Sequence, residues 1–540
     1  MRNLPSVAYF DLSGGRDDQS DAIELPTTKM QEIVNFHLER DSLIKRGGYK
    51  QRHVSAITGT PYVQRIYQHV NNSGERKVIV AANGKLYRTN DVAPHTPADI
   101  TGTAGTGGAL ATGRDAIIDF ITYDGEVFGL DGENKMFKIA DHSSSAVAVT
   151  HGEITTARVI GKFYEHVILG DITEKDYVAE GGPQKRYPYR MAWNKPPDAT
   201  DFASLDRHND FERGDRIVAF RQHGEYLLIF FERSIWIGSF ASQGGMVQTE
   251  FNFRKLVDRV GCVSAQSIVS TDRGTFWLDN RGPYWLPSGP PSFPRFIGKP
   301  LETFWSKVQK ARLPYSVGAE LSEKDSIVWG VAFNDNQVVN NRAIVANYEE
   351  WSRIGREVHP AFSIWAGSTA RGFEFNSLSR IFEGTNERER LVGGTYDGWF
   401  CTLDEGTSDF QLSDGSTGAG IEAGFKTPMY WAGDRTRDKI WYNFGFDVDL
   451  QTRKTVTVEV RLFNNPTADT TTYTVGTQSP GLGSFIIGES KLASHDLGRI
   501  KGALHGRSRY IEMQVSVDAN MTAFELHGIY IYFKHGGRWS

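Results

Sequence analysis

Short runs of β-branched and aromatic residues, separated by tight turns, recur between about residue 60 and residue 405. In the first copy KVIVAA and KLYRTN flank Asn83-Gly84, and in the second AIIDFITY and EVFGL flank Asp124-Gly125. Asn-Gly and Asp-Gly favour type I′ turns because both residues accept positive φ. The pattern predicts consecutive antiparallel hairpins, and this prediction constrains the fold more than any other feature.

The hairpins repeat in units of about 40 to 50 residues with three or four strands each, as in the blades of a β-propeller. A single blade cannot bury both of its faces, whereas a closed ring can. We therefore expect an all-β chain with a β-propeller of about six to eight blades over residues 56–405. Stacked β-sandwiches remain the alternative, because the spacing of the copies is uneven.

The two ends of the chain follow other patterns. Residues 1–55 form a polar lead-in, expected to be an extended N-terminal arm, and residues 406–424 (rich in Gly, Ser and Asp) are expected to be a linker. Alternation in TVTVEVRLF and YIEMQVSV predicts a C-terminal β-sandwich over residues 425–540. One segment, 299–314, has apolar residues at helical spacing and predicts a short helix packed on the ring.

Composition excludes several classes of protein. The 60 Lys and Arg against 65 Asp and Glu give a formal charge of −5, which argues against a protein that coats duplex DNA. Two cysteines, Cys262 and Cys401, are too few for a disulfide framework or a cysteine-rich zinc site. The longest apolar run is YLLIFF, and no signal-peptide core is present, so an unsecreted, non-membrane protein is expected.

Motifs for catalysis are absent from the sequence. The glycine-rich stretch TGTAGTGGALATG lacks the Lys-Ser or Lys-Thr that completes a P-loop. No G-x-S-x-G elbow, H-E-x-x-H helix or EF-hand loop occurs. We therefore expect no enzyme, no catalytic residues, no metal ligands and no cofactor.

The stretch STDRGTFW nearly matches the Asp-box of sialidase-type propellers. In that motif the aspartate caps a hairpin turn and the tryptophan packs between blades, which assigns these structural roles to Asp272, Gly274 and Trp277. A sialidase would also need an arginine cluster, a tyrosine nucleophile and acidic partners, and no segment combines them. The motif supports the fold and not an activity.

The stretch SLIKRGGYKQR is either a phosphate-binding loop or a structural turn. Its four basic residues are Lys45, Arg46, Lys50 and Arg52. We favour the turn, with Gly47 and Gly48 giving the backbone freedom for a chain reversal, Tyr49 anchored on a core, and the charges directed at an acidic neighbour.

The start of the chain resembles the tail nozzle, or tail-hub, proteins of short-tailed bacteriophages. The residues that carry the resemblance are Gly14-Gly15, Leu25-Pro26, Asn35-Phe36 and Arg46-Gly47-Gly48-Tyr49. Gly47 stands where many relatives have proline. Blade sequences around Trp236 and Gly261-Cys262, and the pieces LVGGTYDGWFCTLDEG and FELHGIYIYFKHGGR, are similar to that family as well.

This resemblance implies a structural virion protein in the phage tail. It implies a homohexameric ring below the portal-adaptor protein, contacts with tail needle, fibre or tailspike proteins, and transient contact with viral DNA in the channel. We expect an acidic lumen with few basic rings, because phosphate-binding contacts would retard DNA. The loop between Gly102 and Gly113 is the candidate channel loop.

Two other functions remain open from the sequence. A carbohydrate-binding or sialidase-like propeller in host receptor recognition would need an aromatic and polar pocket on the ring. A cellular scaffold propeller would bind peptides on its central face. The long arm favours the nozzle, because a polar lead-in suits the bridging of a neighbour.

Overall fold

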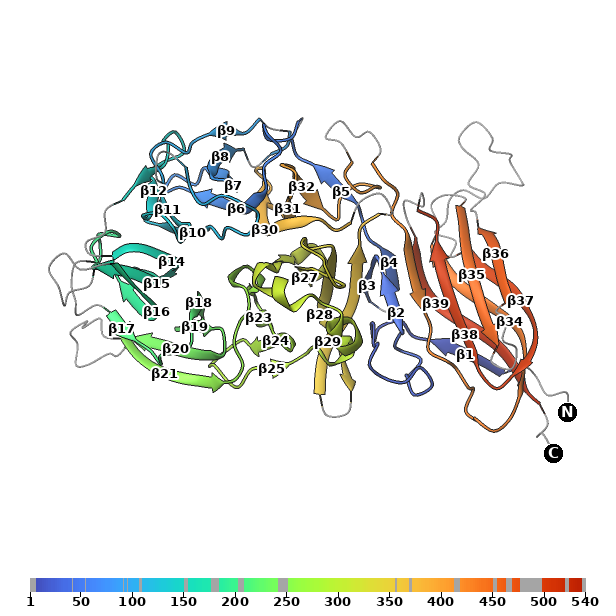
Figure 1. The fold of residues 1–540 in the computed structure, drawn as a ribbon. Coiled ribbons are helices and arrows are strands. Elements are labelled where there is room, and N and C mark those ends of the chain that lie inside the picture. The colour runs from blue at the N-terminus through green and yellow to red at the C-terminus, as the bar shows by residue number, and fades with distance from the viewer. Residues whose placement is uncertain are drawn as a thin grey trace.

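A ring of β-sheets lies beside a two-layered β-sandwich in the computed structural model (Figure 1). Strands and turns make up nearly all of both parts, and the one α-helix in the described residues is α1 (Glu302–Ser306). The structure describes the chain except for residues 1–5, 41, 54, 91, 95, 106–108, 150–153, 176–183, 203–207, 241–250, 355–356, 369–371, 412–417, 450–453, 463–468, 476–497, 520–523 and 537–540.

The ring is a β-propeller of four-stranded antiparallel blades, as predicted. Six blades are separate sheets, and a seventh, β26–β29, continues into a larger sheet. The first four blades are β6 (Val63–Val70), β7 (Arg76–Ala82), β8 (Lys85–Thr89) and β9 (Ala98–Asp99); β10 (Asp119–Tyr123), β11 (Glu126–Leu130), β12 (Phe137–Ile139) and β13 (Val147–Ala148); β14 (Ile154–Phe163), β15 (His166–Lys175), β16 (Gln184–Trp193) and β17 (His208–Asp210); and β18 (Ile217–His223), β19 (Tyr226–Phe231), β20 (Ser234–Phe240) and β21 (Phe251–Asp258).

The last three blades close the ring against β6. They are β22 (Val269–Thr271), β23 (Gly274–Asp279), β24 (Gly282–Pro287) and β25 (Arg295–Phe296); β26 (Val317–Leu321), β27 (Ser326–Val331), β28 (Arg342–Ile354) and β29 (Glu357–Ala366); and β30 (Phe375–Glu383), β31 (Arg388–Thr395), β32 (Phe400–Leu403) and β5 (Tyr49–Gln51). The final blade therefore takes its outer strand from the N-terminal segment, and this pairing fastens the ring.

Turn chemistry explains the hairpins at the start of the ring. Asn83 and Gly84 have φ of 42° and 87°, and Asp124 and Gly125 have φ of 48° and 73°. Both central residues of each turn thus adopt the positive φ that a type I′ turn requires. The predicted hairpins lie in the first two blades, β6–β9 and β10–β13.

The C-terminal sandwich consists of two sheets. One has the order β3-β4-β39-β34-β37 with β1 also paired to β39, and the other is a nine-stranded sheet that ends in β33-β38-β35-β36. Apolar side chains from both sheets form a single core between them. Its strands are β33 (Ala423–Lys426), β34 (Lys439–Asp449), β35 (Lys454–Leu462), β36 (Asp469–Val475), β37 (Gly498–Ser508), β38 (Ile511–Val517) and β39 (Glu525–His535).

The N-terminal arm runs through both domains. Its strands are β1 (Ser6–Phe10), β2 (Glu32–Val34), β3 (Phe36–Glu39), β4 (Ser42–Lys45) and β5. Strand β2 pairs with β29 of the propeller on one side and with β33 of the sandwich on the other, so one continuous sheet joins the domains. Phe10, Ile33 and Phe36 of the arm are fully buried in the sandwich core. The arm is therefore a structural part of both domains.

The predicted helix over 299–314 is present but shorter. Helix α1 lies between two 3₁₀ segments, Lys299–Leu301 and Lys310–Tyr315. Gln309 has an extended backbone, so the helix does not continue into the second segment. Further 3₁₀ turns cover Ala265–Ser267 and Ser322–Lys324. No helix in the described part of the chain is long and apolar enough to cross a membrane.

Candidate functional site at the arm junction and the propeller axis

Arg46 is the buried centre of the junction between the arm and the two domains. Its Nε donates to Asn35 Oδ1 at 2.8 Å, and its terminal nitrogens bind both carboxylate oxygens of Asp409 at 2.8 Å. The same nitrogens donate to the carbonyl oxygens of Gly47 and Ala366, each at 2.8 Å. All five N–H groups of the guanidinium therefore have acceptors. This arrangement fixes the side chain in one position.

The Arg46–Asp409 pair is shielded from water, since both side chains are 0% exposed. Burial lowers the pKa of the Arg46 guanidinium, but Tyr49 and Asp409 raise it, and the resulting pKa lies above its usual value. Asp409 Oδ2 also accepts a hydrogen bond from Ser368 N at 3.1 Å. A buried ion pair of this kind is costly to break because the remaining charge loses its partner.

Gly47 and Gly48 are needed for close packing and not for a special backbone angle. A Cβ on Gly48 would lie 2.0 Å from the Ser408 carbonyl oxygen, and one on Gly47 would lie 2.6 Å from the Asp404 carbonyl oxygen. Neither glycine has a φ in the left-handed region. Close contacts with the backbone of Asp404 and Ser408 are therefore what requires glycine at these two positions. The segment predicted as a linker packs directly onto the arm.

The basic residues of SLIKRGGYKQR are mostly inside the protein. Lys45, Arg46 and Arg52 are 6%, 1% and 2% exposed. Tyr49 is fully buried and makes edge contacts with Phe375 at a ring-centroid distance of 5.0 Å. The three buried cations cannot contact the backbone of a nucleic acid in the folded chain, so this stretch is a structural segment and not a phosphate-binding loop.

Gly14 and Gly15 place the first loop of the arm against the propeller. Gly14 N donates to the Thr28 carbonyl oxygen at 2.9 Å, and a Cβ on Gly14 would lie 2.6 Å from that oxygen. Gly15 has a φ of +70°, and its Cβ would lie 2.7 Å from Phe362 N in β29. Both positions therefore exclude a side chain.

Lys45, which the sequence predicted to be directed at an acidic neighbour, reaches into the sandwich domain. Its Nζ donates to the carbonyl oxygens of Asp518 and Ala519 at 3.1 and 3.4 Å. Burial and, next, the charge of Arg46 lower the pKa of Lys45 to about 8, although Asp518 and Asp409 raise it. The folded protein therefore releases this proton more readily than the unfolded chain does.

This difference predicts a pH-dependent effect of the substitution Lys45→Met. Between about pH 8 and about pH 10.5 the unfolded chain binds more protons at Lys45 than the folded chain, so wild-type stability rises with pH in that window. We expect the wild type to gain about 2 kcal/mol relative to Lys45→Met between about pH 7.5 and about pH 10. Denaturant unfolding of both proteins at the two pH values measures this difference. If the unfolding free energies of the two proteins differed by the same amount at both pH values, the lowered pKa of Lys45 in the folded protein would be contradicted.

The Asp-box turn is capped by a neighbour of the predicted aspartate. Thr271 Oγ1 accepts a hydrogen bond from Arg273 N at 3.1 Å and donates to the Gly274 carbonyl oxygen at 3.4 Å. The Asp272 side chain is 75% exposed, so the capping role expected for it was wrong. Gly274 has a φ of +133°, and its Cβ would lie 2.1 Å from the Leu286 carbonyl oxygen.

Trp277 packs between two blades. It lies in β23, is fully buried and contacts Phe230 of the neighbouring blade at a centroid distance of 5.2 Å. Its Nε1 donates to the Gly261 carbonyl oxygen at 2.9 Å. This is the place that the Asp-box pattern assigns to its tryptophan.

The candidate channel loop is held at both ends. Gly113 N donates to Asn83 Oδ1 at 2.8 Å, and the Gly113 carbonyl oxygen accepts from Gln64 Nε2 at 2.7 Å. At Gly102 a Cβ would lie 2.4 Å from the Ala146 carbonyl oxygen. The Gly102 end is therefore closely packed and the Gly113 end is held by hydrogen bonds, while residues 106–108 at the centre of the loop lie outside the described residues.

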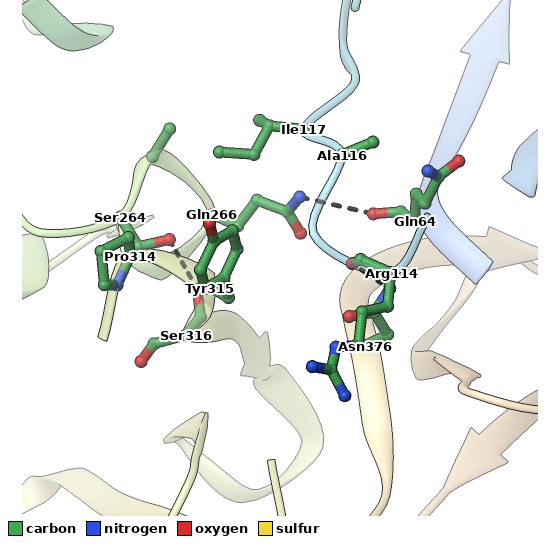
Figure 2. Close-up of a pocket in the computed structure, with 11 residues that line it drawn as sticks. Gln64, Arg114, Ala116, Ile117, Ser264, Gln266, Pro314, Tyr315, Ser316 and Asn376 are labelled. Carbon is green, nitrogen blue, oxygen red and sulfur yellow. Dashed lines mark hydrogen bonds between the residues drawn. The ribbon is translucent and has the colours of Figure 1, made fainter. Parts of the chain in front are cut away.

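The axis of the propeller narrows to a constriction made of amide and hydroxyl side chains. Figure 2 shows the Gln266 side chain extending toward Gln64, where its Nε2 donates to the Gln64 carbonyl oxygen at 3.3 Å. Ser264 Oγ donates to the Ser316 carbonyl oxygen at 2.6 Å on one side. The space left between the lining residues is about 20 Å³, room for about one water molecule. Side chains of separate blades thus meet at this point.

Two larger cavities flank the constriction. One, of about 310 Å³, shares Ile117, Ser264 and Tyr315 with it, and contains charged side chains of both signs. The other, of about 170 Å³, shares Gln266 with the constriction and includes Arg221 in its lining. Sequence reasoning missed these cavities because their residues come from inner strands of different blades and form no local motif. A sequence signal for these cavities would be a polar residue near the start of each inner strand, repeated from blade to blade.

Comparisons with known proteins leave the family of the chain open. No family model and no curated protein sequence matches it. Solved structures that resemble it include BamB from Moraxella catarrhalis (10% identity, 74% of this chain and 97% of BamB, TM-score 0.34). The computationally designed Ika8 protein is another (10% identity, 65% of this chain and 99% of Ika8, TM-score 0.34). Likenesses this weak carry no argument, so the propeller assignment rests on the strand pairings.

The described residues contain no group of three or more His, Cys, Asp or Glu side chains arranged to hold a metal ion. The charged side chains at the arm junction are engaged in structural contacts. A small ligand has room in the axial cavities, and also in a more open hollow of about 570 Å³ between the first two blades, beside Glu75 and His142.

Proposed function

We propose that the chain is a structural virion protein that forms the nozzle ring of a short-tailed phage tail and extends the channel for DNA retention and ejection. The resemblance of the arm and of several blade segments to nozzle proteins supports this proposal. The expected assembly is a homohexamer below the portal-adaptor protein, with tail needle, fibre or tailspike proteins as further partners.

The observation that carries the proposal is the path of the arm. Strand β2 joins a propeller blade to a sandwich sheet, and Arg46 links the arm to Asp409 beside the last blade. The two domains are thus held by a continuous sheet and a buried ion pair, and not by a linker alone. A ring that resists the pressure of packaged DNA needs this rigidity.

The constriction on the propeller axis favours a DNA path that lies outside the single propeller. Gln266 and Gln64, from separate blades, are hydrogen-bonded at that point at 3.3 Å, so the proposal does not route DNA through a single propeller. The channel in this proposal therefore lies between copies of the chain, at the centre of the ring. The formal charge of −5 per chain favours a lumen that binds DNA weakly, since few counterions are displaced.

Imaging of the assembly tests the proposed function. We expect negative-stain images of the purified chain, mixed with the portal-adaptor complex of its own virus, to show a six-fold ring with a central hole. The chain alone, at the same concentration, is the control for self-association. Persistent monomers in both samples, or a predominantly basic lumen in a cryo-EM map, would contradict the proposal.

A second candidate is a carbohydrate-binding propeller that acts in host receptor recognition. The axial cavity of about 310 Å³ favours it, because such a volume suits a small ligand and the nozzle function does not require it. Glycan-array binding by the isolated chain, without ring formation, would support this candidate over the nozzle.

A further inference from the structure

The arm loop, residues 13–30 between β1 and β2, is held against the propeller by backbone hydrogen bonds. Arg16 N donates to the Phe362 carbonyl oxygen in β29 at 2.8 Å. Asp18 N donates to the Pro300 carbonyl oxygen at 3.0 Å. The loop is therefore fastened both to a blade and to the 3₁₀ segment before α1.

A buried hydrogen bond joins Lys29 of the arm loop to His359 of β29. Lys29 Nζ lies 3.1 Å from His359 Nε2 and 3.4 Å from Asp17 Oδ2. Asp17, Lys29 and His359 are 1%, 2% and 1% exposed, so water screens their charges weakly. One cation, one anion and one histidine are thus enclosed where the arm meets the propeller.

The hydrogen bonds determine where the histidine carries its proton. His359 Nδ1 lies 3.2 Å from the Pro360 carbonyl oxygen, which can only accept, so Nδ1 carries the proton. The Lys29 ammonium group can only donate, so His359 Nε2 accepts with its lone pair. The closed loop therefore requires a neutral imidazole. A second proton, on Nε2, would place two positively charged donors 3.1 Å apart.

The charged groups around His359 make the closed loop resist this second proton. Burial and the charge of Lys29 are the main causes that lower the pKa of His359 to about 4. Lys299 lowers it as well, whereas the Pro360 carbonyl group and Asp17 raise it. A histidine in water has a pKa of about 6.5. An open loop therefore binds more protons than the closed loop between about pH 6.5 and about pH 4, and acid favours opening across this window.

Asp18 of the arm loop titrates with the opposite effect. Its carboxylate accepts from Thr303 N at 3.1 Å and from Phe304 N at 3.0 Å, and it pairs with Arg16 at 3.1 Å. Burial raises the pKa of Asp18 despite these partners. The closed loop thus takes up a proton at Asp18 more readily than the open loop does, and acid favours the closed loop at this residue.

We propose that Lys29 and His359 form a latch that holds the arm loop on the propeller at neutral pH and releases it in acid. Protonation of His359 Nε2 removes the acceptor for Lys29, and the loop opens so that both cations reach water. The rest of the arm stays in place, because β2 remains paired with β29 and β33. This response to pH is independent of the proposed ring function.

Hydrogen exchange of the full chain, measured by mass spectrometry at about pH 7.5 and about pH 5, tests the latch. For amides of the arm loop, the measured rate divided by the intrinsic rate at the same pH gives the opening equilibrium constant. We expect this constant to rise about thirtyfold from about pH 7.5 to about pH 5, the ratio given by pKa values of about 6.5 and about 4 for the open and closed loop. Amides of β19, in another blade, should change less than about threefold.

The substitution His359→Gln isolates the titration of this one side chain. Glutamine offers Lys29 an oxygen acceptor and takes up no proton in this range, so the arm-loop constant should change less than about threefold between the two pH values. Comparison of two pH values within one variant cancels any loss of stability that does not depend on pH. His223→Gln is the matched control, since His223 is also buried with a lowered pKa but contacts Thr275 in the propeller, away from the arm. It should keep the thirtyfold rise of the arm loop.

Three results would overturn the latch. The first is an arm-loop constant that changes less than about threefold in the wild type. The second is a rise that His359→Gln retains, which would assign the opening to another group. The third is an equal rise at the amides of β19, which would show that acid unfolds the chain as a whole and does not release the arm loop.

Discussion

Replacing Arg46 by alanine is expected to lower the free energy of unfolding by about 3–5 kcal/mol. The substitution leaves the Asp409 carboxylate, which is 0% exposed, without its bidentate partner. It also removes the donors to Asn35 Oδ1 and to the carbonyl oxygen of Ala366. The unpaired buried charge accounts for most of the loss, since Asn35 Oδ1 still accepts from Ala366 N at 2.8 Å.

Denaturant unfolding, followed by circular dichroism, measures this effect. Arg46→Lys keeps the charge and loses the paired donors, so it should lie between the wild type and Arg46→Ala. The double variant Arg46→Met with Asp409→Leu removes both charges and should be more stable than Arg46→Ala. A loss below about 1 kcal/mol for Arg46→Ala would mean that water replaces the guanidinium, and the junction would not depend on this pair.

Replacing Gly48 by alanine should have an effect of similar size, above about 4 kcal/mol. The added Cβ would lie 2.0 Å from the carbonyl oxygen of Ser408 and 2.8 Å from its nitrogen. Both contacts are with backbone, so relief requires movement of the segment that carries Asp409. Gly48 N also donates to the Gly406 carbonyl oxygen at 3.1 Å, a bond that such a movement would break.

Gly372→Ala is the matched control for Gly48→Ala. Its φ is outside the left-handed region, and its Cβ would have ordinary contacts, the nearest being Glu374 Cγ at 3.6 Å. We expect Gly372→Ala to change stability by less than about 1 kcal/mol. Soluble yield and thermal unfolding compare the two variants. Equal stability of both would show that the Ser408 segment moves away at little cost.

The turns and strands of the propeller could be predicted from local sequence. Asn83-Gly84 and Asp124-Gly125 adopt the positive φ values that their residue types favour, because turn conformation depends on two adjacent residues. Alternation of apolar and polar residues predicted the strands of the sandwich for the same local reason. The blades and the C-terminal sheets follow from these signals.

The sites depended on pairs of residues that only the folded chain brings together. Arg46 and Asp409 are 363 positions apart, and the sequence contains no signal that selects this pairing among all others. Lys45 was predicted to point at an acidic neighbour, but the sequence could not indicate that its Nζ donates to the carbonyl oxygens of Asp518 and Ala519 in the sandwich. Gly48 looked like a flexible hinge, whereas its lack of a side chain serves a backbone contact with Ser408.

The sequence by itself determined the all-β class, the hairpins of the blades and the place of the second domain, since these depend on turn chemistry and on a period of two residues. Tertiary structure alone decided that the arm belongs to both domains, that its basic segment is buried, and that residues of separate blades line the axial cavities. Ring closure is the physical reason, because it places inner strands from opposite ends of the chain around one axis.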